Sequence, residues 1–125
     1  MHFWSNSLAA MAVMLAALTG PPAGAQADSV KELGTSGAVH FVVVSTPVAR
    51  SDDALRHVAR GICTGAQVCA VRFWLSEAQA ARRLPMTDEQ ASHEYASYAV
   101  NRNTGLDDFT CKPGPDRVPP CIQTP

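Results

Sequence analysis

The sequence predicts a small two-layer sandwich of the α+β or α/β class, built on a three-stranded sheet in the order β-α-β-α-α-β with its first two strands parallel. Residues 39–44 are continuously apolar or aromatic apart from one histidine, which is typical of a central strand. A stretch with helical apolar spacing follows, and residues 68–75 then alternate with the period of a strand. A strand, helix and strand that share one sheet form a parallel unit, which is right-handed in about 98% of cases.

The N-terminal residues 1–27 predict a secretory signal peptide. An apolar run from Leu8 to Leu18 is shorter than the roughly 20 residues that a bilayer span needs. Small residues at Ala25 and Ala27 match a signal-peptidase site, so we expect cleavage after Ala27 and export to the periplasm or the medium. The first seven residues contain no Lys or Arg, and an uncleaved, membrane-tethered form is the alternative. After cleavage we expect no stable membrane span.

Composition limits the class of partner. The chain has ten Lys and Arg against eleven Asp and Glu, and these charges are interspersed along it, so we expect no nucleic-acid partner. Most of the positive residues are Arg, which is typical of GC-rich coding and favours a bacterial source.

The elements are then expected in chain order. Residues 28–38 are polar, contain Gly34 and Gly37 and predict a flexible lead-in to a single domain over residues 39–111. Pro47 ends the first strand and Ser51 caps the following helix. The apolar stripe of that helix has members at i, i+3, i+4 and i+7: Leu55, Val58, Ala59 and Ile62. In the second strand, Cys69, Val71, Phe73 and Leu75 are expected to face the core.

Two capping-box patterns predict two further helices. Ser76 with Gln79 begins a short helix that ends before Pro85, and Thr87 with Gln90 begins a helix that runs to about residue 100. The core stripe of the second helix is predicted to be Ala91, Tyr95 and Tyr98. Residues 106–111 are a candidate edge strand, and residues 112–125 form a proline-rich tail.

The four cysteines predict disulfides, because an even number of cysteines in an exported chain is typical of a disulfide framework. The local pairing joins Cys63 to Cys69 and Cys111 to Cys121, although four cysteines allow three connectivities. The chain has no Cys-x-x-Cys motif, and we expect no metal and no redox role for these residues.

Catalytic patterns are weak. His57 lies on the polar side of its helix, and the adjacent His93 and Glu94 point about 100° apart on a helix and so do not converge on one ligand. The chain contains no Gly-x-Ser-x-Gly elbow and no glycine-rich phosphate loop. We therefore assign no catalytic residue and expect no cofactor.

The candidate binding residues are Arg72 and Trp74, on the less apolar face of the second strand, because Arg and Trp often anchor protein contacts. The alternative for this pair is that Trp74 is packed under a helix with Arg72 at the rim.

The leading hypothesis for function is an exported, disulfide-stabilised and non-enzymatic module that binds a protein or another envelope component. The alternative is a small hydrolase or metal-dependent enzyme that uses His57 or His93 with Asp53, Glu89 or Glu94.

Overall fold

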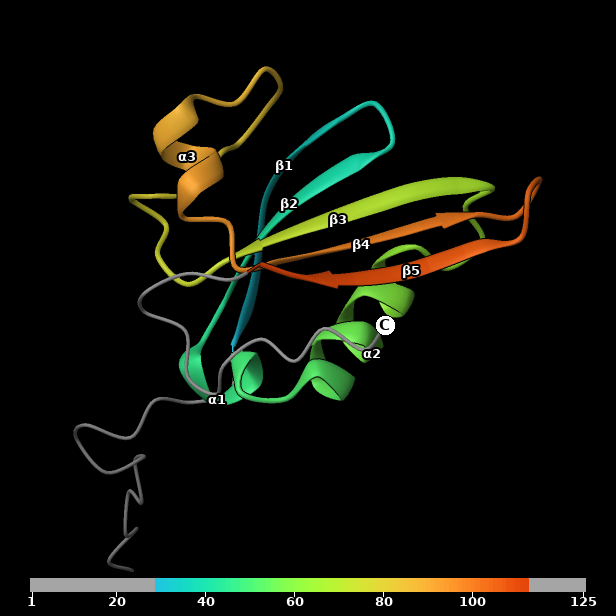
Figure 1. Ribbon diagram of the computed structural model, residues 1–125, viewed down its shortest axis with the longest axis horizontal. Helices are drawn as coiled ribbons and strands as arrows, with labels where there is room; N and C mark the ends of the chain where they lie inside the picture. Colours follow the sequence, from blue (N-terminus) through green and yellow to red (C-terminus); the bar gives the residue numbers. More distant parts are fainter. Residues whose placement is uncertain (1–28, 113–125) are drawn as a thin grey trace, which may run out of the picture.

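The computed structural model describes residues 29–112 as one mixed sheet with short helices (Figure 1). The elements in chain order are β1 (Val30–Ser36), β2 (Val39–Val44), α1 (Thr46–Ala49), α2 (Asp52–Ile62), β3 (Val68–Trp74), α3 (Asp88–Ser92), β4 (Ala96–Asn101) and β5 (Leu106–Cys111). The predicted capped helix is present, because the Ser51 side chain accepts a hydrogen bond from the amide of Ala54 at the start of α2.

The sheet has five strands in the order β1-β2-β3-β4-β5, so the prediction of a three-stranded sheet is wrong. Its first two strands, β1 and β2, are antiparallel and are joined by a turn at Gly37, whose φ is +58°. The only parallel pairing in the described part of the chain joins β2 to β3 across the helical connection. The segment expected as a flexible lead-in instead forms the edge strand β1.

The predicted long helix after Thr87 is also wrong. Thr87 does form a capping box with Gln90, but α3 ends at Ser92, and residues 96–101 form β4. Tyr98 and its neighbours at positions 96 and 100 are buried while the residues between them are half-buried, which is the alternation of a strand. The first capping pattern, at Ser76, yields only turns, and Leu75 lies beyond the end of β3 and is exposed.

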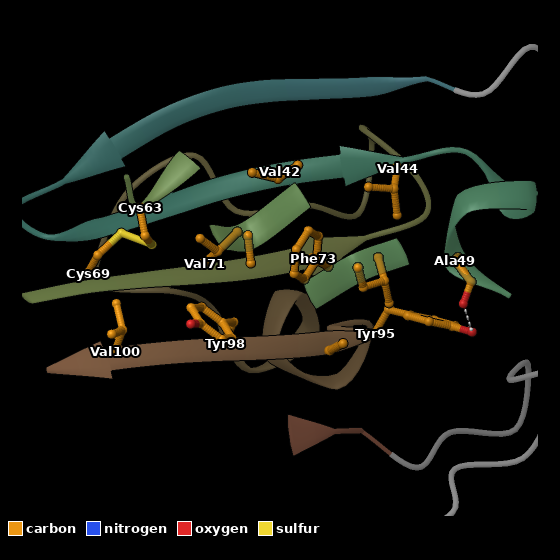
Figure 2. Packing of buried hydrophobic residues seen from close by; sticks show 13 residues of the cluster. Val42, Val44, Ala49, Cys63, Cys69, Val71, Phe73, Tyr95, Tyr98 and Val100 are labelled. Carbon is orange, nitrogen blue, oxygen red and sulfur yellow. Dashed lines mark hydrogen bonds between the residues drawn. A yellow bond between two sulfur atoms is a disulfide. The ribbon is translucent and has the colours of Figure 1, made fainter. Parts of the chain in front are cut away.

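The first face of the sheet is covered by α1 and α2 (Figure 1). The predicted stripe of α2 packs here, with Leu55 and Ala59 fully buried against the sheet. Figure 2 shows this cluster with the Cys63–Cys69 disulfide at one end and Tyr95 at the other. The Tyr95 hydroxyl donates a hydrogen bond to the carbonyl oxygen of Ala49 at 2.9 Å, which ties the start of β4 to α1.

The second face is covered only at one end, where α3 and the preceding loop lie on the side opposite α1 and α2 (Figure 1). Phe41 and Trp74 are fully buried there, with ring centroids 6.0 Å apart, beneath Ala80 and Ala81 of the loop. The indole nitrogen of Trp74 donates a hydrogen bond to the carbonyl oxygen of Gln90 at 2.8 Å. A small apolar cluster therefore fixes the loop to the sheet.

The predicted signal peptide and most of the proline-rich tail lie outside the described residues. Within residues 29–112, no helix is both long enough and apolar enough to span a bilayer.

Candidate functional site

Among residues 29–112, no helix or loop covers the second face of the sheet over β4, β5 and the part of β3 that precedes Trp74. In antiparallel strands, the side chains of two directly paired residues point to the same side of the sheet. Every second pair along β3, β4 and β5 belongs to the core beneath α2, so the pairs between them face away from α2. These outward pairs form rows with one residue from each of β3, β4 and β5: Val68, Asn101 and Leu106; Ala70, Ala99 and Asp108; Arg72, Ser97 and Thr110. We call these nine residues the open sheet face.

One end of the open sheet face is apolar. Among residues 29–112, the exposed large apolar side chains are Val30, Val68, Leu75, Leu84 and Leu106. Val68 and Leu106 are 48% and 47% exposed and lie in the same row, separated by Asn101. In the adjacent row, Ala70 and Ala99 are directly paired, half-buried and short, and Asp108 adds an exposed carboxylate on β5. A sheet surface with exposed aliphatic groups is suited to contact another macromolecule.

The other end of the open sheet face is formed by an ion pair. The guanidinium of Arg72 contacts one carboxylate oxygen of Glu94 at 2.9 Å, between side chains that are 33% and 3% exposed. The second oxygen of Glu94 is buried and has no hydrogen-bond partner among the described residues. Burial of a carboxylate is costly unless it is paired, so Arg72 has a structural role in addition to its exposure.

Of the two residues predicted to bind a partner, only Arg72 is accessible. Trp74 is fully buried between Phe41 and the loop, and its single donor is used by Gln90. The arrangement matches the alternative in which the ring packs beneath other elements and the guanidinium lies at the rim.

The cysteines predicted to pair locally lie where α2 meets β3. Cys63 is the C-cap residue of α2 and Cys69 is the second residue of β3, with an S–S distance of 2.09 Å and a Cα–Cα distance of 5.7 Å. Cys111 is also disulfide-bonded, and its predicted partner Cys121 lies outside the described residues. The disulfide between Cys63 and Cys69 fixes the end of the crossover helix to the strand that leads into the open sheet face.

The two candidate histidines are not brought together. His57 is exposed on α2, on the first face of the sheet, whereas His93 caps the end of α3 on the other side. Among residues 29–112, no group of three or more His, Cys, Asp or Glu side chains is arranged to hold a metal ion.

A network of exposed charges lies at the edge of the loop that covers Trp74. Glu77 accepts hydrogen bonds from Lys31 of β1, at 3.1 and 3.2 Å, and from Arg82, at 2.8 Å. The hydrogen bond with Lys31 and then that with Arg82 lower the pKa of Glu77 below its ordinary value of 4.5.

Sequence reasoning considered Glu94 only as a possible catalytic group beside His93, and it assigned no binding role to Val68 or Leu106. The predicted helix over residues 87–100 placed Glu94 on a helical surface. The sequence signal that could have corrected it is the alternation of Ala96, Tyr98 and Val100 with smaller or polar residues, which is the period of a strand. Val68 and Leu106 acquire their significance only from the strand register, which the sequence does not contain as a local pattern.

The fold and this surface define a small mixed α/β domain with one helix-covered sheet face and one partly open sheet face. No protein-family model matches the chain, and no curated protein and no solved structure shows significant similarity to it.

Proposed function

We propose that this protein is an exported, disulfide-stabilised and non-enzymatic binding module, and that it contacts a partner protein of the cell envelope or medium through the open sheet face. The observation that supports this proposal most strongly is the row that holds Val68 and Leu106. Each of these aliphatic side chains is almost half exposed. Burying them against a partner would favour binding by about 25 cal/mol per Å² of apolar area removed from water.

The polar end of the same face supports specificity. Arg72 retains exposed surface while Glu94 holds its guanidinium in place, so a partner meets a cation whose orientation is already fixed. An apolar contact region next to an oriented arginine is a combination that protein interfaces frequently use.

The proposal is tested by changing the apolar row without changing the core. In the double variant Val68→Asp and Leu106→Asp, two charges replace exposed aliphatic groups, and the matched control is Leu84→Asp, which changes a similarly exposed leucine outside the open sheet face. The tagged protein is exported from its native host and purified with whatever it binds, and its fold is checked by circular dichroism.

We expect a discrete stoichiometric partner with the wild type and with Leu84→Asp, and loss of that partner with the double variant. Equal retention of the partner by a folded double variant would contradict the role of the open sheet face. Absence of any stoichiometric partner from the wild type would contradict the binding function itself.

A further inference from the structure

A second candidate site lies in the loop that precedes α3, outside the open sheet face. The loop and the start of α3 enclose a cleft of about 690 Å³. This volume falls within the range of roughly 300–1,000 Å³ that is typical of sites for small molecules. None of the nine residues of the open sheet face lines this cleft.

The lining of the cleft combines an apolar surface with unneutralised positive charge. Its apolar part is formed by Ala78, Ala80 and Pro85, and its polar part includes Arg82 and Arg83. The one carboxylate in the lining, Glu77, is paired with both Lys31 and Arg82, so its charge is already compensated. Arg83 is exposed and forms no ion pair or hydrogen bond with any residue between 29 and 112.

The walls of the cleft are held in place by contacts on several sides. Ala80 is buried against the cluster of Phe41 and Trp74, and the amide of Leu84 donates to the Ser36 hydroxyl at 3.0 Å. A Cβ atom at Gly34 would lie 2.5 Å from the carbonyl oxygen of Arg82. The loop therefore packs so closely against β1 at this point that only a glycine fits without a steric clash. A cleft with walls fixed in this way loses little entropy when a ligand binds.

From these observations we infer that the cleft binds a small organic anion, with an apolar body against Ala78, Ala80 and Pro85 and a carboxylate or phosphate group at Arg83. A guanidinium donates two parallel hydrogen bonds to either group, and a free arginine at the mouth of an apolar cleft selects for ligands that contain both features. The inference is independent of the proposed partner surface.

The test is an NMR titration in which small-molecule probes are added to the isotope-labelled protein with its disulfides intact. Binding is monitored through the chemical shifts of the backbone amides. Benzoate and phenyl phosphate are the anionic probes, and they distinguish a carboxylate from a phosphate ligand. Benzylamine and benzyl alcohol are the matched probes, because they have a similar ring with a positive charge or no charge.

We expect benzoate or phenyl phosphate to produce saturable shifts confined to residues 77–90, and benzylamine to produce none there. Added sodium chloride is expected to weaken anion binding, because the charge of an exposed arginine is screened. The inference is overturned if neither anion shifts these amides at millimolar concentration, or if benzylamine and the anions act alike.

The matched variants are Arg83→Gln and Arg50→Gln, which each remove one exposed guanidinium, the first at the cleft and the second at the end of α1. We expect Arg83→Gln to weaken binding of the anion about threefold to tenfold and Arg50→Gln to leave it unchanged. Equal affinity of wild type and Arg83→Gln would overturn the assignment of Arg83. Both positions are exposed, and the unshifted amides outside residues 77–90 show whether each variant is folded.

Discussion

At the scale of single residues, the pair of Arg72 and Glu94 links stability to the open sheet face. Glu94 is almost completely buried, and the Arg72 guanidinium is its only charged contact in the described part of the chain. Because one oxygen of Glu94 has no hydrogen-bond partner among residues 29–112, the ion pair with Arg72 leaves part of the cost of burial uncompensated within this part of the chain. Loss of Arg72 would therefore affect the folded state as well as any partner.

Arg72→Ala is expected to lower the free energy of unfolding by about 1–3 kcal/mol, because it leaves a buried carboxylate without its cation. The matched variant Arg50→Ala removes an exposed arginine that forms no ion pair with any residue between 29 and 112, and it should change stability by less than about 0.5 kcal/mol. Urea unfolding at neutral pH measures both. Equal stability of Arg72→Ala and wild type would show that the ion pair contributes nothing.

The pH dependence of stability is expected to include a contribution from Glu77. Hydrogen bonds from Lys31 and Arg82 lower the pKa of Glu77 in the folded state below its value near 4.5 in the unfolded chain. The ionised carboxylate therefore stabilises the fold fully at pH values above the unfolded pKa. This stabilisation is lost as the pH falls through the lower pKa of the folded state. Glu77→Gln should therefore reduce stability at neutral pH but not at strongly acidic pH. A stability difference that stays constant across this range would contradict the assignment.

At the scale of elements, the parts that were predicted correctly are those set by local sequence. The Ser51 cap and the apolar spacing of Leu55 and Ala59 lie within a few turns of chain, and together they specify α2. The capping box at Thr87, which is also a local pattern, forms as predicted. In contrast, β1 is an edge strand that exists only because it pairs with β2, and it contains an irregularity between Glu32 and Gly34 that removes any regular alternation. Its glycines therefore suggested a flexible lead-in.

The misassigned helix has a related cause. Residues 91–100 contain three alanines, which favour helices, and Tyr95 and Tyr98 also fit helical spacing from Ala91. Pairing with both β3 and β5 outweighs that preference, because β4 lies inside the sheet and buries its alternate residues. The open sheet face could not be predicted for the same reason, since it depends on the register of three strands.

The contact between the loop and β1 gives a prediction at this scale. Gly34→Ala should destabilise the fold by about 1–3 kcal/mol, because the added methyl group would collide with the Arg82 carbonyl and push the loop from the sheet. Gly61→Ala, in α2, meets no atom within 4 Å and should instead stabilise by up to about 1 kcal/mol. Thermal unfolding compares the two, and equal effects would contradict the close approach at Gly34.

At the scale of the whole molecule, the two faces of the sheet have different roles. The first is filled by α1, α2 and the cluster that includes the disulfide, and it accounts for most of the buried core. The second is covered by the loop and α3 over β1, β2 and the end of β3, and by no described helix over β4 and β5. The well-packed side of the domain thus supports the open sheet face, on which the proposed function depends.

Site-specific photo-crosslinking in the native host tests directly whether the open sheet face binds a partner. A photoreactive residue at position 99 lies in the middle of the open sheet face, and one at position 91 lies exposed on α3 as the matched control. If the open sheet face binds a partner, the photoreactive residue at position 99 should give a discrete protein adduct that the residue at position 91 does not give. Adducts of equal yield and identity from both positions, or no adduct from position 99, would show that the open sheet face is not a binding surface.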